Sequence, residues 1–102
     1  MYRASDRIEH DEWLSDIEAA SDRLDLGTAA RSHAVDLFLS TVPEEDRSKQ
    51  ATMAASVYVG ALVAGEERSQ SAVAEATDVS RLTIQQRWKD LLETAGLEAP
   101  GW

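Results

Sequence analysis

The chain has 102 residues and a formal net charge of −9, from 19 acidic and 10 basic side chains. This length predicts one domain, and the lack of cysteine excludes disulfides, thiolate zinc sites and a thiol nucleophile. The first residues show no signal-peptide pattern and no apolar run reaches about 18 residues, so we expect a cytoplasmic protein. Only two of the bases are lysines, and such an acidic, lysine-poor composition favours a halophilic source.

Two helices are predicted in the first part of the chain. Apolar residues recur with the spacing of one helix face at Trp13, Leu14, Ile17, Ala20 and Leu24. We expect Gly27 to end this helix in a left-handed conformation and Thr28 to cap the next helix. The second helix should stop before Pro43. Its helical period is carried by Ala30, Ala34, Leu37 and Phe38.

The third helix, expected from about residue 48 to 64, is different in kind. Its stretch ATMAASVYVGALVA, residues 51–64, is apolar on nearly all sides. A helix that is hydrophobic all round is either a membrane span or a buried core helix. Fourteen residues interrupted by Thr52, Ser56 and Gly60 are too few for a span. We therefore predict a central helix that is wrapped by the others and closed by Gly65.

The last two helices form a predicted helix-turn-helix over residues 69–92, SQSAVAEATDVSRLTIQQRWKDLL. Such a motif packs two short helices across a turn of roughly three to four residues. Asp78 can adopt the left-handed conformation that the turn needs, and Ser80 is a typical N-cap. The buried side should contain Val73, Val79, Ile84, Trp88, Leu91 and Leu92. No strand or hairpin pattern occurs, so the predicted fold class is all-α with five helices.

The outward face of the last helix predicts contacts with DNA. The acidic total argues against nucleic acid, but Val79 to Lys89 contains three bases and no acid. Glutamine can bond an adenine edge, arginine a guanine edge, and leucine can touch a thymine methyl. The expected reading surface is Arg81, Leu82, Gln85, Gln86 and Lys89. Phosphate contacts that set the register are expected from Ser80, Thr83 and Arg87. The same pattern also occurs in helical bundles that never touch DNA.

Several runs of the chain carry a resemblance to a known family. They are LDL (24–26), ATMAASVYVGAL (51–62), GEERSQ (65–70), VAE (73–75) and DVSRLTIQQRWK (78–89). With them, residues 24–96 resemble one cyclin-like repeat of the transcription initiation factor IIB family, especially the second repeat of archaeal members. The resemblance implies a five-helix domain with the third helix buried.

The resemblance also implies a function. Full-length members of that family bind TATA-binding protein on promoter DNA, and the helix-turn-helix of their second repeat reads an upstream element. Leu82 and Gln85 occupy the positions that contact bases, where many members carry valine and arginine. Because Gln85 lacks the charged guanine contact of arginine, we expect a different sequence preference.

Family members also carry a zinc ribbon and two repeats. With one repeat and no cysteine, this chain is expected to be a shortened accessory factor without cofactor, metal site or catalysis. We expect residues 1–12 to be a flexible segment, 13–96 the repeat and 97–102 a tail. One hypothesis is a DNA-binding regulator that acts alone, as a homodimer, or on a promoter occupied by TATA-binding protein. The other is a docking module for TATA-binding protein or RNA polymerase that does not read DNA.

Overall fold

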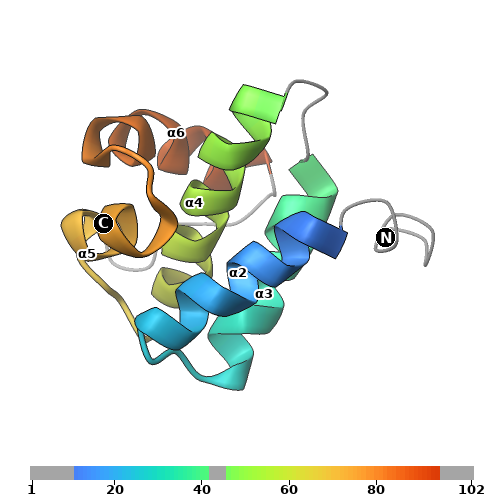
Figure 1. The fold of residues 1–102 in the computed structure, drawn as a ribbon, viewed down its shortest axis with the longest axis vertical. Helices are drawn as coiled ribbons and strands as arrows, with labels where there is room; N and C mark the ends of the chain where they lie inside the picture. The colour runs from blue at the N-terminus through green and yellow to red at the C-terminus, as the bar shows by residue number, and fades with distance from the viewer. Residues whose placement is uncertain (1–10, 42–45, 95–102) are drawn as a thin grey trace.

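The computed structural model describes residues 11–41 and 46–94. Within these ranges it contains five helices and no strand, so the predicted all-α class is confirmed. The helices, labelled as in Figure 1, are α2 (Asp11–Arg23), α3 (Thr28–Thr41), α4 (Asp46–Val63), α5 (Gln70–Thr77) and α6 (Arg81–Thr94). The residues around Pro43 and those predicted as a flexible start and a tail lie largely outside the described ranges. None of the described helices is long and apolar enough to cross a membrane.

Helix α4 is the centre of the molecule, and the other four helices pack around it (Figure 1). Every residue from 51 to 62 is buried, which confirms the prediction of a central helix buried on all sides. Val57 and Val59 of this helix are completely inaccessible. Burial of each large apolar side chain is worth roughly 1.5–3 kcal/mol, so α4 contributes a substantial part of the hydrophobic stabilisation. The covering helices add other fully buried side chains, namely Ile17, Phe38, Val73 and Ile84.

Helices α3 and α4 approach each other closely at Gly60. A Cβ atom built on Gly60 would lie 2.7 Å from the backbone nitrogen of Ala34 and 2.8 Å from the carbonyl oxygen of Ala30. Real Cβ atoms do not come this close to backbone atoms, and neither backbone can move without shifting its helix. A glycine is therefore required here, and small residues on α3 complete the contact.

The end of α2 corrects one expectation. The left-handed residue is Asp25, with φ 55°, and not Gly27. The N–H of Leu26 donates to the carbonyl of Ser21 at 3.0 Å, and the N–H of Asp25 donates to the carbonyl of Asp22 at 3.2 Å. These two bonds form a Schellman motif, in which the residue after the left-handed one contacts the last turn of the helix. The turn comes two residues early because it buries the Leu26 side chain, which is only 4% exposed.

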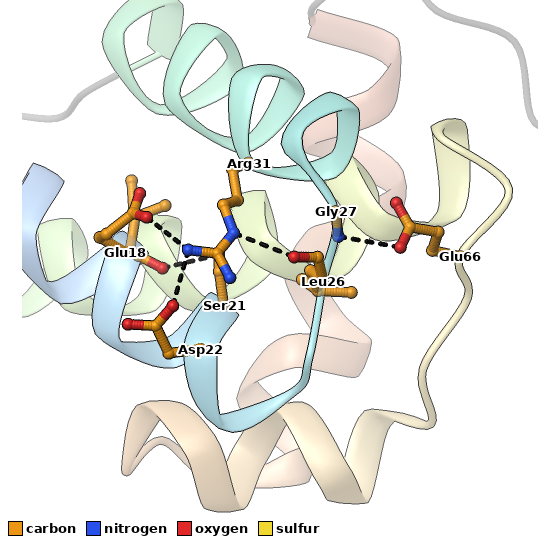
Figure 2. Close-up of polar contacts among 8 residues, drawn as sticks. Glu18, Ser21, Asp22, Leu26, Gly27, Arg31 and Glu66 are labelled. Atoms are coloured by element: carbon orange, nitrogen blue, oxygen red, sulfur yellow. Dashed lines mark hydrogen bonds and ion pairs between the residues drawn. The ribbon is translucent and has the colours of Figure 1, made fainter.

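The start of α3 corrects a second expectation. The carbonyl of Gly27 accepts the N–H of Arg31 at 3.2 Å, so Gly27 occupies the cap position and Thr28 is the first helical residue. The N–H of Gly27 donates to Oε1 of Glu66 at 2.9 Å (Figure 2). By contrast, the predicted end of α4 at Gly65 is confirmed by its φ of 78°.

Arg31 holds the corner between α2 and α3 together (Figure 2). Its guanidinium forms ion pairs with Glu18 and, at 2.7 Å, with Asp22, while its Nε donates to the carbonyl of Leu26 at 3.0 Å. Hydrogen bonds to the Asp22 and Glu18 carboxylates raise the pKa of Arg31 above its ordinary value. The side chain therefore stays charged at every working pH, and it fixes how α3 leaves the corner.

The Gly60→Ala variant tests the close helix contact. Alanine normally stabilises a helix by about 1 kcal/mol relative to glycine. Here we expect a net loss of about 1–3 kcal/mol in the free energy of unfolding, because the methyl group forces the two backbones apart. Urea unfolding followed by circular dichroism measures the loss, with Ser32→Ala on the exposed side of α3 as a control near zero. A Gly60→Ala protein as stable as the wild type would contradict the assigned contact.

Candidate nucleic-acid interface

The predicted helix-turn-helix consists of α5, a turn and α6, and Arg68 fixes where it begins. This half-buried side chain precedes α5 and reaches back to the end of α2. Its Nε donates to the carbonyl of Leu24 at 2.9 Å and its Nη2 to that of Asp25 at 3.2 Å. Its Nη1 donates to the carbonyl of Glu66 at 2.9 Å. Because carbonyls at a helix end lack partners within the helix, one guanidinium both satisfies them and anchors the segment leading into α5.

Both ends of α5 are capped. The side chain of Ser69 accepts the N–H of Ala72 at 3.0 Å and so acts as the N-cap. At the other end, Nη1 of Arg23 on α2 donates to the carbonyl of Ala76 at 2.8 Å. A cation at the C-terminus of a helix interacts favourably with the helix dipole. Helix α5 has only eight residues, so these tertiary contacts set its position.

The turn is built on Asp78, as the sequence predicts. Asp78 has φ 57° and ψ 37°, in the left-handed region, and its N–H donates to the carbonyl of Ala74. The N–H of Val79 donates to the same carbonyl at 3.2 Å. The side chain of Val79 packs against the core, as the sequence predicts, but it is only half-buried. Its position beside the exposed turn leaves one side of it facing a surface hollow.

Ser80 caps α6, which confirms the prediction for this residue. Its Oγ accepts the N–H of Thr83 at 3.2 Å, and its carbonyl accepts the N–H of Ile84 at 3.3 Å. The Ser80 and Thr83 hydroxyls also bond to each other at 2.7 Å. Since each hydroxyl has one hydrogen, whichever of the two donates leaves the hydrogen of the other available. One O–H at the start of α6 can therefore bond an external acceptor.

The buried residues of α6 determine which of its side chains face outward. All four residues predicted to be buried on this helix are buried: Ile84, Trp88, Leu91 and Leu92. The Trp88 ring meets the Tyr58 ring of α4 edge-on, with a centroid distance of 5.6 Å. Edge-to-face aromatic pairs have a preferred geometry, so this contact restrains rotation of α6 about its axis.

The outer side of α6 presents the predicted contact residues. Thr83 is half-buried, and the others are exposed: Ser80, Arg81, Leu82, Gln85, Gln86, Arg87 and Lys89. Leu82 is 60% exposed, the largest exposed hydrophobic side chain of the described residues. Leu82, Gln85, Gln86 and Lys89 follow the spacing of one helix face. An exposed leucine among amides and bases has no role in the core and is free to contact another molecule.

Two of the basic side chains on α6 lie next to other features of the surface. Nζ of Lys89 lies 5.5 Å from the centroid of the Trp88 ring, within the range of a cation–π contact. Arg87 lines two hollows beside α4, one with Gln50 and Thr83 and another with Thr52. Arg87 therefore stands at the edge of the exposed face, next to α4, and not at its centre.

Sequence reasoning missed the two arginines that position the motif. Arg23 and Arg68 bond to residues 53 and 44 positions away in the chain. Neither lies in a local pattern that points to these partners, because contacts at such separations depend on the packing of α2 beside α5. Their charge alone gives no signal in a chain with ten bases.

The amino-acid sequence is similar to those of known transcription factors. Residues 13–94 match the family described as "Transcription factor TFIIB repeat". The chain is 30% identical over 83 residues to "Transcription initiation factor IIB" of Pyrococcus abyssi, which covers 78% of this chain and 28% of that protein. It is 32% identical over 78 residues to the protein of that name from Methanosphaerula palustris, covering 74% and 23%. Against that of Archaeoglobus fulgidus it is 40% identical over 52 residues, covering 51% and 16%. The chain thus spans about a quarter of the length of these relatives.

Ser80 gives a test of the capped turn. We expect Ser80→Ala to lower the free energy of unfolding by about 0.5–2 kcal/mol, because the N–H of Thr83 loses its acceptor. Ser80→Asp restores an acceptor at the cap and should stay within about 0.5 kcal/mol of the wild type. Urea unfolding compares both with Ser71→Ala, an exposed position inside α5, where a change of less than about 0.5 kcal/mol is expected. Equal stability of Ser80→Ala and wild type would rule out the cap.

Proposed function

This chain belongs to the transcription factor TFIIB repeat family, and we propose that it is an accessory transcription factor that binds promoter DNA through α6. The observation that carries the proposal is the exposed face of α6. It combines three bases, two amides and a leucine over Val79 to Lys89, without an acid. The core contacts of Trp88 and Ile84 hold this face outward.

The chemistry of this face suits base reading in a major groove, which is wide enough to admit an α-helix. Leu82 can contact the methyl group of thymine, and the amides of Gln85 and Gln86 can pair with adenine N6 and N7. Arg81, in the first turn of α6, can bond guanine O6 and N7. Because these side chains share one exposed surface, they can reach neighbouring base pairs at the same time.

Phosphate contacts would set the register of the helix in the groove. The free O–H of the Ser80–Thr83 pair lies at the start of α6, where unpaired backbone N–H groups also favour an anion. Arg87, at the edge of the face, can reach a phosphate on one strand. These contacts orient α6 and leave sequence discrimination to Leu82 and the glutamines.

The net charge of −9 limits how much of the affinity can come from the phosphates. In concentrated salt, as for a halophilic source, the contribution of counterion release is smaller still. We therefore propose that base contacts carry most of the binding and that the chain acts on a promoter already occupied by TATA-binding protein. In a homodimer, a second copy of the chain would also add contacts with the DNA.

The test is a binding titration of the full chain on TATA-box promoter fragments in high potassium chloride, with and without TATA-binding protein. We expect the Arg81→Ala/Gln85→Ala/Arg87→Ala variant to bind about 30-fold or more weakly, because it loses two base contacts and a phosphate contact. Ser15→Glu/Ser32→Glu lowers the net charge by the same two units at exposed positions on α2 and α3 and serves as the control. This control should bind within a few-fold of the wild type.

Equal affinities of the triple variant and the wild type would contradict DNA reading by α6. A pull-down that recovers TATA-binding protein or RNA polymerase equally with both proteins, and without DNA, would then favour a docking module. The acidic remainder of the chain suits a basic partner surface, which is the observation behind that second candidate.

A further inference from the structure

We propose that the cleft between α2, α4 and α5 is a docking site for an arginine-containing segment of a partner protein. The cleft has a volume of about 560 Å³ and is separate from the outer face of α6. Its apolar lining includes Trp13, Ala19 and Met53. Three exposed carboxylates, those of Asp16, Glu75 and Asp78, surround it.

The carboxylates around the cleft are available to a ligand. Asp16, Glu75 and Asp78 form no ion pair with any side chain in the described ranges. The nearby acids Glu18 and Asp22 on the same helix α2 are, by contrast, both paired with Arg31. Three unpaired acids therefore lie at the cleft, where an occupant with positive charges would be attracted.

The cleft already binds one guanidinium from its own chain. Arg23 lines it, and its Nη1 donates to the carbonyl of Ala76 at the end of α5. The C-terminal end of a helix carries partial negative charge, and each carbonyl there can accept a further hydrogen bond. Because Arg23 is tied to this backbone carbonyl and not to a carboxylate, it leaves the acidic groups free for a second cation.

The three acids do not form a metal site. Among residues 11–41 and 46–94, no group of three or more acidic, histidine or cysteine side chains is placed to hold a metal ion. The three carboxylates therefore do not converge on one point charge. Because the acids come from α2, α5 and the turn after α5, a peptide segment with more than one positive charge matches this arrangement better than a small ion does.

The apolar lining selects arginine in particular. Trp13 is half-buried, and the centroids of its ring and the Phe38 ring are 6.3 Å apart. One part of the indole therefore stays accessible while the ring is held by its contact with Phe38. Arginine stacks on tryptophan faces and lays its aliphatic stem along apolar surface while its head reaches a carboxylate. A guanidinium over Trp13 with its donors directed to Asp16 or Glu75 uses both features of the cleft.

Titration of the ¹⁵N-labelled full chain with a capped nine-residue peptide of alternating arginine and leucine tests this site. We expect chemical-shift changes to concentrate on the Trp13 indole and on the backbone of residues 16–23 and 74–78. Asp16→Asn/Glu75→Gln should weaken binding about fivefold or more, because two charge pairs are lost. Glu67→Gln/Glu93→Gln removes two exposed, unpaired acids elsewhere and should change binding less than twofold. A peptide with glutamine in place of arginine should not bind.

Three results would overturn the proposal: no shift changes, changes spread evenly over the acidic surface, or equal weakening by the two double variants. The last two would mean that the peptide senses only the net charge of the protein. The experiment contains no DNA, so it succeeds or fails independently of DNA binding by α6. Far-ultraviolet circular dichroism of each variant establishes that the fold is intact before the titration.

Discussion

The close packing of α3 against α4 at Gly60 is the constraint on which the rest of the structure depends. At Gly60 the two backbones are so near that a single methyl group has no room, and Ala30 and Ala34 face it from α3. Tight packing of α3 on one side of α4 fixes the position of this central helix. Helices α2, α5 and α6 pack on the remaining sides of α4. Because interiors are close-packed, a displacement of α3 is transmitted through α4 to the helices on its other sides. The direction in which α6 presents its outer face thus depends on a glycine in another helix.

Much of this arrangement could be predicted from the sequence, because its signals are local. The buried central helix follows from a run of apolar and small residues, and the turn of the helix-turn-helix follows from Asp78 and Ser80, whose side chains and conformations act within a few residues. The end of α2 shows where local reasoning fails. Gly27 is the better left-handed residue by itself, but the turn falls at Asp25 because Leu26 must be buried. The left-handed conformation costs a residue other than glycine roughly 1–2 kcal/mol, and burial of a leucine side chain, worth roughly 1.5–3 kcal/mol, offsets this cost.

The remaining part could not be predicted, because it depends on which helices become neighbours. Arg23 and Arg68 bond to backbone carbonyls far away in the sequence and together tie both ends of α5 to the end of α2. Backbone carbonyls carry no sequence signature, so neither arginine can be distinguished from a solvent-exposed one without the fold. Only part of the candidate interface could therefore be predicted. The exposed residues of α6 follow from helical periodicity, but the arginine contacts that hold α5 against the core do not.

The cleft and the hollow beside α6 have two lining residues in common, Gln50 and Asp78, and this relates the two proposals physically. Asp78 lines the cleft below α5 and also the hollow beside α6 that contains Arg87 and Thr83. In the free protein, Glu75 and Asp78 carry negative charge on the motif that would approach phosphates, which opposes DNA binding. A cationic segment bound at the cleft neutralises part of this charge and so reduces the repulsion. Thermodynamic linkage then requires the reciprocal effect, in which bound DNA strengthens the attachment of the segment by the same factor. An acidic body with a basic helix is in this way suited to bind DNA together with a basic partner more strongly than alone.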